Sequence, residues 1–201
     1  MINLLQINAS ISNSSGQSSR LANQFVAAFH ARHPTAAIVV RDVAAGDPVP
    51  HLNAERFGAF ITKPDQRDFE QNAIVAYSDA LISELRQADV VVLGLPMYNF
   101  GVPSQLKAYF DHVARAGVTF KYTEKGPEGL LTGKKAYVFA ARGGLYAGTP
   151  LDTQTTYVRD FLRFIGITDV EFVYAEGLNI SPQSKDEGLA KASAEIARLA
   201  A

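Results

Sequence analysis

Leu93-Gly-Leu-Pro-Met-Tyr-Asn-Phe-Gly-Val-Pro-Ser-Gln105 joins two different hydrophobic patterns. The run from Val90 to Leu95 is continuously apolar, which is typical of a parallel strand that is covered on both faces. Pro96 ends this run, and a helical pattern begins near Ser104. Between them, methionine and aromatic side chains alternate with residues that restrict the backbone. We therefore predict a buried strand followed by a cofactor-binding loop.

The segment after this stretch has the apolar spacing of a core-facing helix, with Ser104 as the predicted N-cap. Its apolar positions are Leu106, Tyr109, Phe110 and Val113. A long connection follows from residue 118 to residue 133 and contains a glycine- and proline-rich turn cluster. Connections of this length inside compact domains are usually functional.

Strand and helix patterns alternate along the whole chain. The predicted strands span residues 2–8, 37–43, 90–95, 135–141 and 170–175. The predicted helices span residues 20–33, 74–85, 104–116, 157–165 and 184–199. We expect the last helix to open with a capping box formed by Ser184 and Glu187. Residues 51–72 show no clear period and are predicted to be irregular or partly helical.

This alternation predicts a single α/β domain of the flavodoxin-like, doubly wound type. Its five strands would be parallel, with right-handed crossovers and helices on both faces. A chain of 201 residues with 47% hydrophobic residues is long enough for one such domain. In this architecture ligands bind beyond the carboxyl ends of the strands. Three loops are predicted there, at residues 9–19, 96–103 and 142–149.

The composition excludes several classes of function. A formal net charge of −1 with dispersed charges argues against binding of nucleic acid or anionic membranes. The chain has no cysteine, so it has no disulfide, thiolate nucleophile or thiolate metal site. The first residues lack the features of a signal peptide, and no apolar run approaches the ~20 residues that span a bilayer. We expect a cytoplasmic protein.

The first loop contains six serines between Ser10 and Ser19 and precedes a helix. Helix N-termini carry free N–H groups and a partial positive charge, so this loop suits a phosphate dianion. It contains neither a Walker P-loop nor a dinucleotide-binding fingerprint. Its composition fits equally well a solvated loop in which serines only cap the helix.

Other residues are weaker candidates for chemistry. His30 and His33 have no third ligand nearby, so a surface position is favoured over a metal site. His112 is predicted to be structural. No nucleophile elbow of a serine hydrolase is present. Asp152 and Asp160 are predicted to lie on a solvated helix face.

A phosphate site, an aromatic loop and a glycine-rich loop at three strand ends together fit a flat ring that carries a phosphate, as in flavin mononucleotide (FMN). Specific blocks also stand out in the sequence: Pro96-Met-Tyr-Asn-Phe100, Ala114-Arg-Ala-Gly-Val-Thr-Phe120 and Arg142-Gly-Gly144. With these blocks the chain resembles the bacterial FMN-dependent NADH:azoreductase and quinone reductase family over nearly its whole length.

The resemblance implies a homodimer with two FMN sites near its interface. It also implies ping-pong turnover, in which NADH or NADPH reduces FMN before an azo compound or a quinone enters. The phosphate-binding positions of the family correspond to Ser10, Gly16, Gln17 and Ser18. Its two ring-binding loops correspond to Met97, Tyr98, Asn99 and Phe100 and to Ala141, Arg142, Gly143 and Gly144. Gly16 and Ala141 stand where serine is common in the family.

On the substrate side of the flavin, the resemblance points to Phe100, Tyr122 and Phe164, in part by contact across the dimer. It assigns no side-chain acid or base, because hydride moves to and from flavin N5 and protons can come from water. The alternative is a flavodoxin-type electron carrier without a small-molecule substrate. Such carriers usually have a strongly acidic docking surface. The net charge of −1 and the aromatic segment 118–133 favour the enzyme.

Overall fold

The computed structural model describes residues 2–46 and 48–200, and these residues form the predicted α/β fold. A five-stranded parallel sheet has the strand order β2-β1-β3-β6-β7. The strands are β1 (Asn3–Asn8), β2 (Ala37–Asp42), β3 (Val90–Pro96), β6 (Lys135–Ala141) and β7 (Asp169–Ala175). Every residue of β3 after the first is buried, as its continuously apolar sequence predicts.

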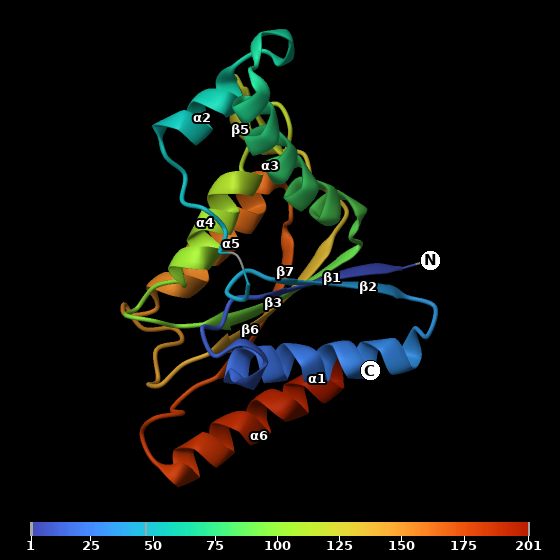
Figure 1. Cartoon of the computed structure of the whole chain (residues 1–201). Coiled ribbons are helices and arrows are strands. Elements are labelled where there is room, and N and C mark those ends of the chain that lie inside the picture. The colour runs from blue at the N-terminus through green and yellow to red at the C-terminus, as the bar shows by residue number, and fades with distance from the viewer. Residues whose placement is uncertain (1, 47, 201) are drawn as a thin grey trace.

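Helices cover both faces of this sheet (Figure 1). On one face lie α1 (Gln17–Arg32) and α6 (Pro182–Leu199). On the other lie α3 (Phe69–Gln87), α4 (Ser104–Val113) and α5 (Thr153–Ile165). Each layer has its own apolar core: Phe25 and Phe139 pack in the first, and Tyr109 and Phe110 in the second. The flavodoxin-like prediction is confirmed.

Two helices are capped differently from the sequence-based prediction. Ser104 is the first residue of α4 rather than its N-cap. Its hydroxyl donates to the Gln105 side chain and accepts from no backbone N–H of the first turn in the described chain. The last helix begins at Pro182, two residues earlier than predicted. Pro182 occupies the first helical position, where proline fits well because its φ angle is already helical. Ser181 is the N-cap, and its hydroxyl accepts from the Ser184 backbone N–H.

Residues 51–72, whose sequence shows no clear period, form an arm that extends beyond the sheet (Figure 1). It contains α2 (Ala54–Ile61), a short 3₁₀ turn and the first turn of α3. Asn53 caps α2, and Asp68 and Gln71 form a capping box at the start of α3. Capping residues therefore define where these helices begin, although the helical segments are too short for a hydrophobic pattern to be recognised in the sequence.

The long connection after α4 contains an antiparallel hairpin of β4 (Phe120–Thr123) and β5 (Gly126–Gly129). The hairpin packs against the end of α5. At Gly129 a Cβ atom would lie 2.0 Å from the backbone nitrogen of Gly166, so only glycine allows this approach. In the part of the chain that the structure describes, no helix is long and apolar enough to cross a membrane.

Candidate functional site

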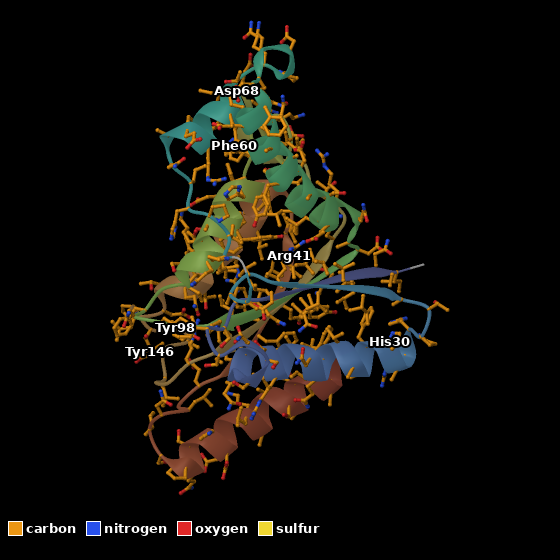
Figure 2. The ribbon with its side chains drawn as sticks, in the orientation of Figure 1. His30, Arg41, Phe60, Asp68, Tyr98 and Tyr146 are labelled. Carbon is orange, nitrogen blue, oxygen red and sulfur yellow. The ribbon has the colours of Figure 1, made fainter. Side chains whose placement is uncertain are left out.

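The three predicted loops follow β1, β3 and β6, which are neighbours in the sheet, so they lie at one end of it. Tyr98 connects the first two loops. Its hydroxyl lies 3.3 Å from Ser10 Oγ and accepts from the Ile11 backbone N–H at 3.2 Å. Figure 2 shows Tyr98 on the same side of the molecule as Tyr146, which belongs to the third loop.

The serine loop ends in the N-terminus of α1, where several donors have no partner within the described chain. The backbone N–H groups of Gln17, Ser18 and Ser19 make no hydrogen bond, as expected for a first helical turn without a side-chain cap. The hydroxyls of Ser18 and Ser19 are also unpaired, although both residues are fully buried. Buried polar groups are nearly always hydrogen-bonded, so this cluster of donors fits an anionic ligand.

Gly16 stands directly before this helix. The Ser10 side chain occupies the space that a side chain at residue 16 would need. A Cβ atom at residue 16 would lie 2.1 Å from Ser10 Oγ. The Ser10 hydroxyl in turn accepts from the Ser12 backbone N–H at 3.2 Å. The glycine at residue 16 therefore leaves room for a hydroxyl from residue 10 at the same point of the loop.

The second loop closes in a tight two-residue turn. Tyr98 and Gly101 exchange two backbone hydrogen bonds, of 3.2 and 2.9 Å. The residues between them have positive φ angles, 49° at Asn99 and 64° at Phe100. This is the pattern of a type I′ turn, and it is strained for a bulky residue such as phenylalanine. The N–H groups of Asn99 and Phe100 have no partner in the described chain, so they are available to a ligand.

Two polar residues at the start of α5 hold this turn from behind. Gln154 is buried, and its Nε2 donates to the carbonyls of Pro96 at 2.9 Å and Gly101 at 3.1 Å. The hydroxyl of Thr153 donates to the carbonyl of Phe100. The sequence does not reveal either residue, because they lie more than fifty positions after the turn they contact and carry no motif.

The third loop presents the backbone of two glycines. The carbonyl groups of Gly143 and Gly144 accept from Asn179 N at 3.0 Å and from Gly177 N at 2.9 Å, while their N–H groups have no partner in the described chain. The second and third loops enclose a hollow of about 260 Å³. Its lining residues are Met97, Asn99, Phe100, Gly143, Tyr146 and Asn179. The structure thus brings two of the predicted loops to one hollow, and Tyr98 joins the serine loop to them.

The guanidinium of Arg142 does not face this hollow. It is buried and donates to Asp152 Oδ1 at 2.8 Å, Thr155 Oγ1 at 2.9 Å and Glu176 Oε1 at 3.2 Å. The prediction that Asp152 lies on a solvated face is therefore wrong. Burial by itself would raise the pKa of Asp152, but the hydrogen bonds from Arg142 and Thr155 outweigh it and hold that pKa below its ordinary value.

Comparison with known proteins agrees with this arrangement. A family model described as having a flavodoxin-like fold matches residues 2–200. A protein of Burkholderia lata, named FMN-dependent NADH:quinone oxidoreductase 6, is 57% identical over 197 residues, which cover 98% of this chain and 99% of that protein. The chain belongs to the FMN-dependent NADH:quinone oxidoreductase family.

Solved structures similar to this chain include azoreductases. An azoreductase from Bacillus anthracis strain Sterne has a TM-score of 0.89 and 31% identity, and the match covers 100% of this chain and 99% of that one. An FMN-dependent NADH-azoreductase from Bacillus anthracis, solved in complex with FMN, has a TM-score of 0.85 and 26% identity, with 100% of both chains covered.

The residues that the family resemblance assigns to the substrate lie in two places. Phe100 lines the hollow and contacts Tyr146 edge-on, with ring centroids 5.5 Å apart. Tyr122 and Phe164 instead lie at the hairpin, where the Phe120 ring is 5.4 Å from Tyr122 and 4.2 Å from Phe164. The hairpin packs against the end of α5, away from the turn after β3 (Figure 1). One chain therefore does not bring these residues to the hollow.

His30, His33 and His112 occupy the positions that the sequence predicts for them. His30 and His33 are exposed, and no group of side chains that could hold a metal ion occurs among the described residues. His112 is fully buried, and its Nε2 lies 2.9 Å from the Pro50 carbonyl oxygen. Burial lowers the pKa of His112, so the neutral ring is favoured in the fold.

Proposed function

We propose that this protein binds FMN and catalyses the two-electron reduction of quinones and aromatic azo compounds, with NADH or NADPH as the electron donor. One observation carries the proposal: unpaired donors lie at three neighbouring strand ends, namely at the N-terminus of α1 and on the two loops that line one hollow. The names of the relatives, FMN-dependent NADH:quinone oxidoreductase and azoreductase, support the same cofactor and reaction.

The phosphate of FMN would be held by the first turn of α1. Ser18 offers both a free N–H and an unpaired buried hydroxyl there, and Gln17 offers a free N–H. The helix dipole favours the negative charge of the phosphate at this point. Ser10 and Gly16 shape the loop around it. The buried hydroxyls make an anionic ligand a better explanation of this loop than simple helix capping, which Ser18 does not perform.

The ring would lie between the other two loops. The free N–H groups of Asn99, Phe100, Gly143 and Gly144 would be available to hydrogen-bond acceptors of the ring, and Met97 and Phe100 would supply apolar contact. The Met97 N–H donates to the Ala141 carbonyl at 3.1 Å, which fixes the two loops to each other. Arg142 acts beneath the loop rather than by touching the ring. Bound FMN supplies hydride transfer through its N5 atom.

The hollow offers no carboxylate, lysine or histidine among its lining residues. Protons for the reduced quinone or azo compound would therefore come from water. An open hollow with an aromatic wall accepts flat electrophiles and discriminates little between their substituents. This fits a ping-pong reaction, in which donor and acceptor use the same face in turn.

A homodimer would complete this site. Tyr122 is 75% exposed in the single chain, so its ring is accessible to a second copy. We infer that a second copy brings its Tyr122 and Phe164 toward the hollow of the first. We also infer a cytoplasmic location, where NADH and NADPH are available.

An anaerobic stopped-flow experiment tests the proposed function. The purified protein, supplied with FMN, should show a bound-flavin spectrum that NADH bleaches rapidly and that a quinone or an azo dye restores. Running NADH and NADPH in parallel would define the donor preference. Protein that does not bind FMN would refute the proposal, and bleaching without turnover of a quinone or azo dye would favour an electron carrier.

A further inference from the structure

Glu176, the first residue after β7, makes an unusual set of contacts with the third loop. Its Oε1 atom accepts from the backbone N–H of Tyr146 at 2.9 Å, from the backbone N–H of Ala147 at 2.9 Å and from Arg142 Nη1 at 3.2 Å. One carboxylate oxygen thus binds three donors, all from residues 142–147. Hydrogen bonds to a charged acceptor are about twice as strong as neutral ones.

Arg142, the side-chain partner of Glu176, is itself held in place by its neighbours. The Arg142 guanidinium is fully buried, is bound by Asp152 at 2.8 Å and lies 5.0 Å from the centroid of the Tyr174 ring. The Tyr174 hydroxyl lies 3.1 Å from Thr155 Oγ1, which also bonds Asp152. Arg142 therefore has one orientation, and the position of the Glu176 carboxylate follows from it.

The residues directly after Glu176 hold the other side of the loop. The backbone N–H groups of Gly177, Leu178 and Asn179 donate to the carbonyls of Gly144, Arg142 and Gly143, at distances of 2.9, 3.2 and 3.0 Å. With the carbonyl groups engaged on this side, the free N–H groups of Gly143 and Gly144 have a fixed direction. Glu176 extends the same restraint to Tyr146, whose ring lines the hollow.

We infer that Glu176 is a positioning residue, which sets the Gly143–Ala147 segment against the ring of the bound flavin. This inference rests on the proposed function and adds a residue that belongs to none of the three predicted loops. Glu176 is not among the residues that line the hollow. It acts through backbone N–H groups and through Arg142, and its effect should therefore appear on the ring side of the site and not on the phosphate side.

The space behind the loop makes a specific test possible. Glu176 and Ala147 both line a hollow of about 480 Å³ between β7 and α6. Replacing Glu176 with alanine would leave the loop donors facing this open space. A small carboxylate from solution can then enter and take the place of the missing side chain, which a residue needed only for folding would not allow.

The experiment measures the dissociation constants of FMN and of riboflavin, by flavin fluorescence, for the wild type, Glu176→Ala and Glu176→Gln. In Glu176→Ala both constants should rise by the same factor, at least about tenfold, or ~1.4 kcal/mol. Glu176→Gln keeps an oxygen that accepts from the backbone, so its rise should be smaller. Acetate should lower the constants of Glu176→Ala, whereas acetamide and chloride should not.

Glu171→Gln is the matched control. Glu171 lies on β7, close to Glu176 in the sequence, but its ion pairs in the described chain are with Lys135 at 2.8 Å and Arg198 at 3.5 Å and not with the loop, so the flavin affinity of this variant should equal that of the wild type. An alanine variant that binds flavin like the wild type would overturn the inference. A loss that acetate does not reverse would overturn it too, because Glu176 would then act in folding alone. Wild-type protein that does not bind FMN would instead refute the proposed function.

Discussion

The loops after β3 and β6 line the same hollow but are stabilised in different ways. The second loop closes on itself through a two-residue turn at residues 98–101 and is held by the neutral side chain of Gln154. The third loop has no such turn across its glycines and is held by a buried cluster of charges, with Arg142 between Asp152 and Glu176.

This difference shows that one task, the presentation of free backbone N–H groups, has a local and a long-range solution. The local solution costs strain, because Phe100 adopts a positive φ angle of 64°. The long-range solution requires charges to be buried, and each must then be matched by a partner. Mutations should therefore destabilise the second loop by removing neutral hydrogen bonds and the third loop by leaving buried charges without a partner.

The largest effect is expected at the charged loop. Arg142→Met would leave two carboxylates, Asp152 and Glu176, without the cation that lies between them, and breaking a buried pair in this way costs about 3–5 kcal/mol. Urea denaturation measures this loss of unfolding free energy. Arg159→Met is the control, because Arg159 is exposed and lies over the Phe172 ring at 5.2 Å, a contact worth about 0.5–1 kcal/mol. Equal losses of unfolding free energy in the two variants would show that the buried charges around Arg142 do not stabilise the third loop.

A smaller effect is expected at the neutral loop. Gln154→Leu removes the donors to the Pro96 and Gly101 carbonyls, and leaving buried acceptors without a partner costs about 1–3 kcal/mol. The same denaturation experiment applies. Thr156→Val, at an exposed position of the same helix, should change the unfolding free energy by less than about 0.5 kcal/mol. A loss at Gln154 as large as that at Arg142 would mean that burial of charge is not what separates the two loops.

The smallest effect is a dependence on pH that only the charged loop should show. The pKa of Asp152 is lowered in the fold from its ordinary value of 3.8, because hydrogen bonds from Arg142 and Thr155 outweigh the effect of burial. The unfolded chain therefore binds the proton first as the pH falls. The stability that ionised Asp152 contributes is complete above the ordinary pKa and is lost as the pH falls through the lowered one.

The comparison of wild type with Asp152→Asn measures this contribution. The difference in unfolding free energy between them should be constant near neutral pH and should shrink as the pH falls below about 4. Gln154→Leu should show no comparable trend relative to the wild type. A difference for Asp152→Asn that stays constant down to pH 3 would show that the ionised carboxylate does not stabilise the third loop.

The same contrast explains how much the sequence predicts. Continuous apolar runs identify buried strands, and serine-, proline- and glycine-rich stretches identify the loops at their ends, because these signals are local. Glu176 and Gln154 carry no such signal, since each acts on a loop that lies tens of residues earlier in the chain. The helical position of Asp152 suggests exposure, whereas its pairing with Arg142 depends on contacts that only the folded chain creates.

The family resemblance predicts the cofactor loops from the sequence alone, but it does not distinguish a residue that touches the ligand from one that supports the loop. Arg142 belongs to the second group, since its guanidinium is buried beneath the loop. Tyr122 and Phe164 do not line the hollow of a single chain, and a sequence pattern contains no information on which copy supplies them.

The most direct test of the three-loop site compares the binding of FMN and riboflavin to the wild type and to Ser18→Ala. The hydroxyl of Ser18 is buried, unpaired and located at the N-terminus of α1, so only a ligand with a phosphate should depend on it. The wild type should bind FMN at least about tenfold more tightly than riboflavin, or by ~1.4 kcal/mol. Ser18→Ala should weaken FMN binding and leave riboflavin binding unchanged. Equal affinity of the wild type for the two flavins would contradict a phosphate site at this helix.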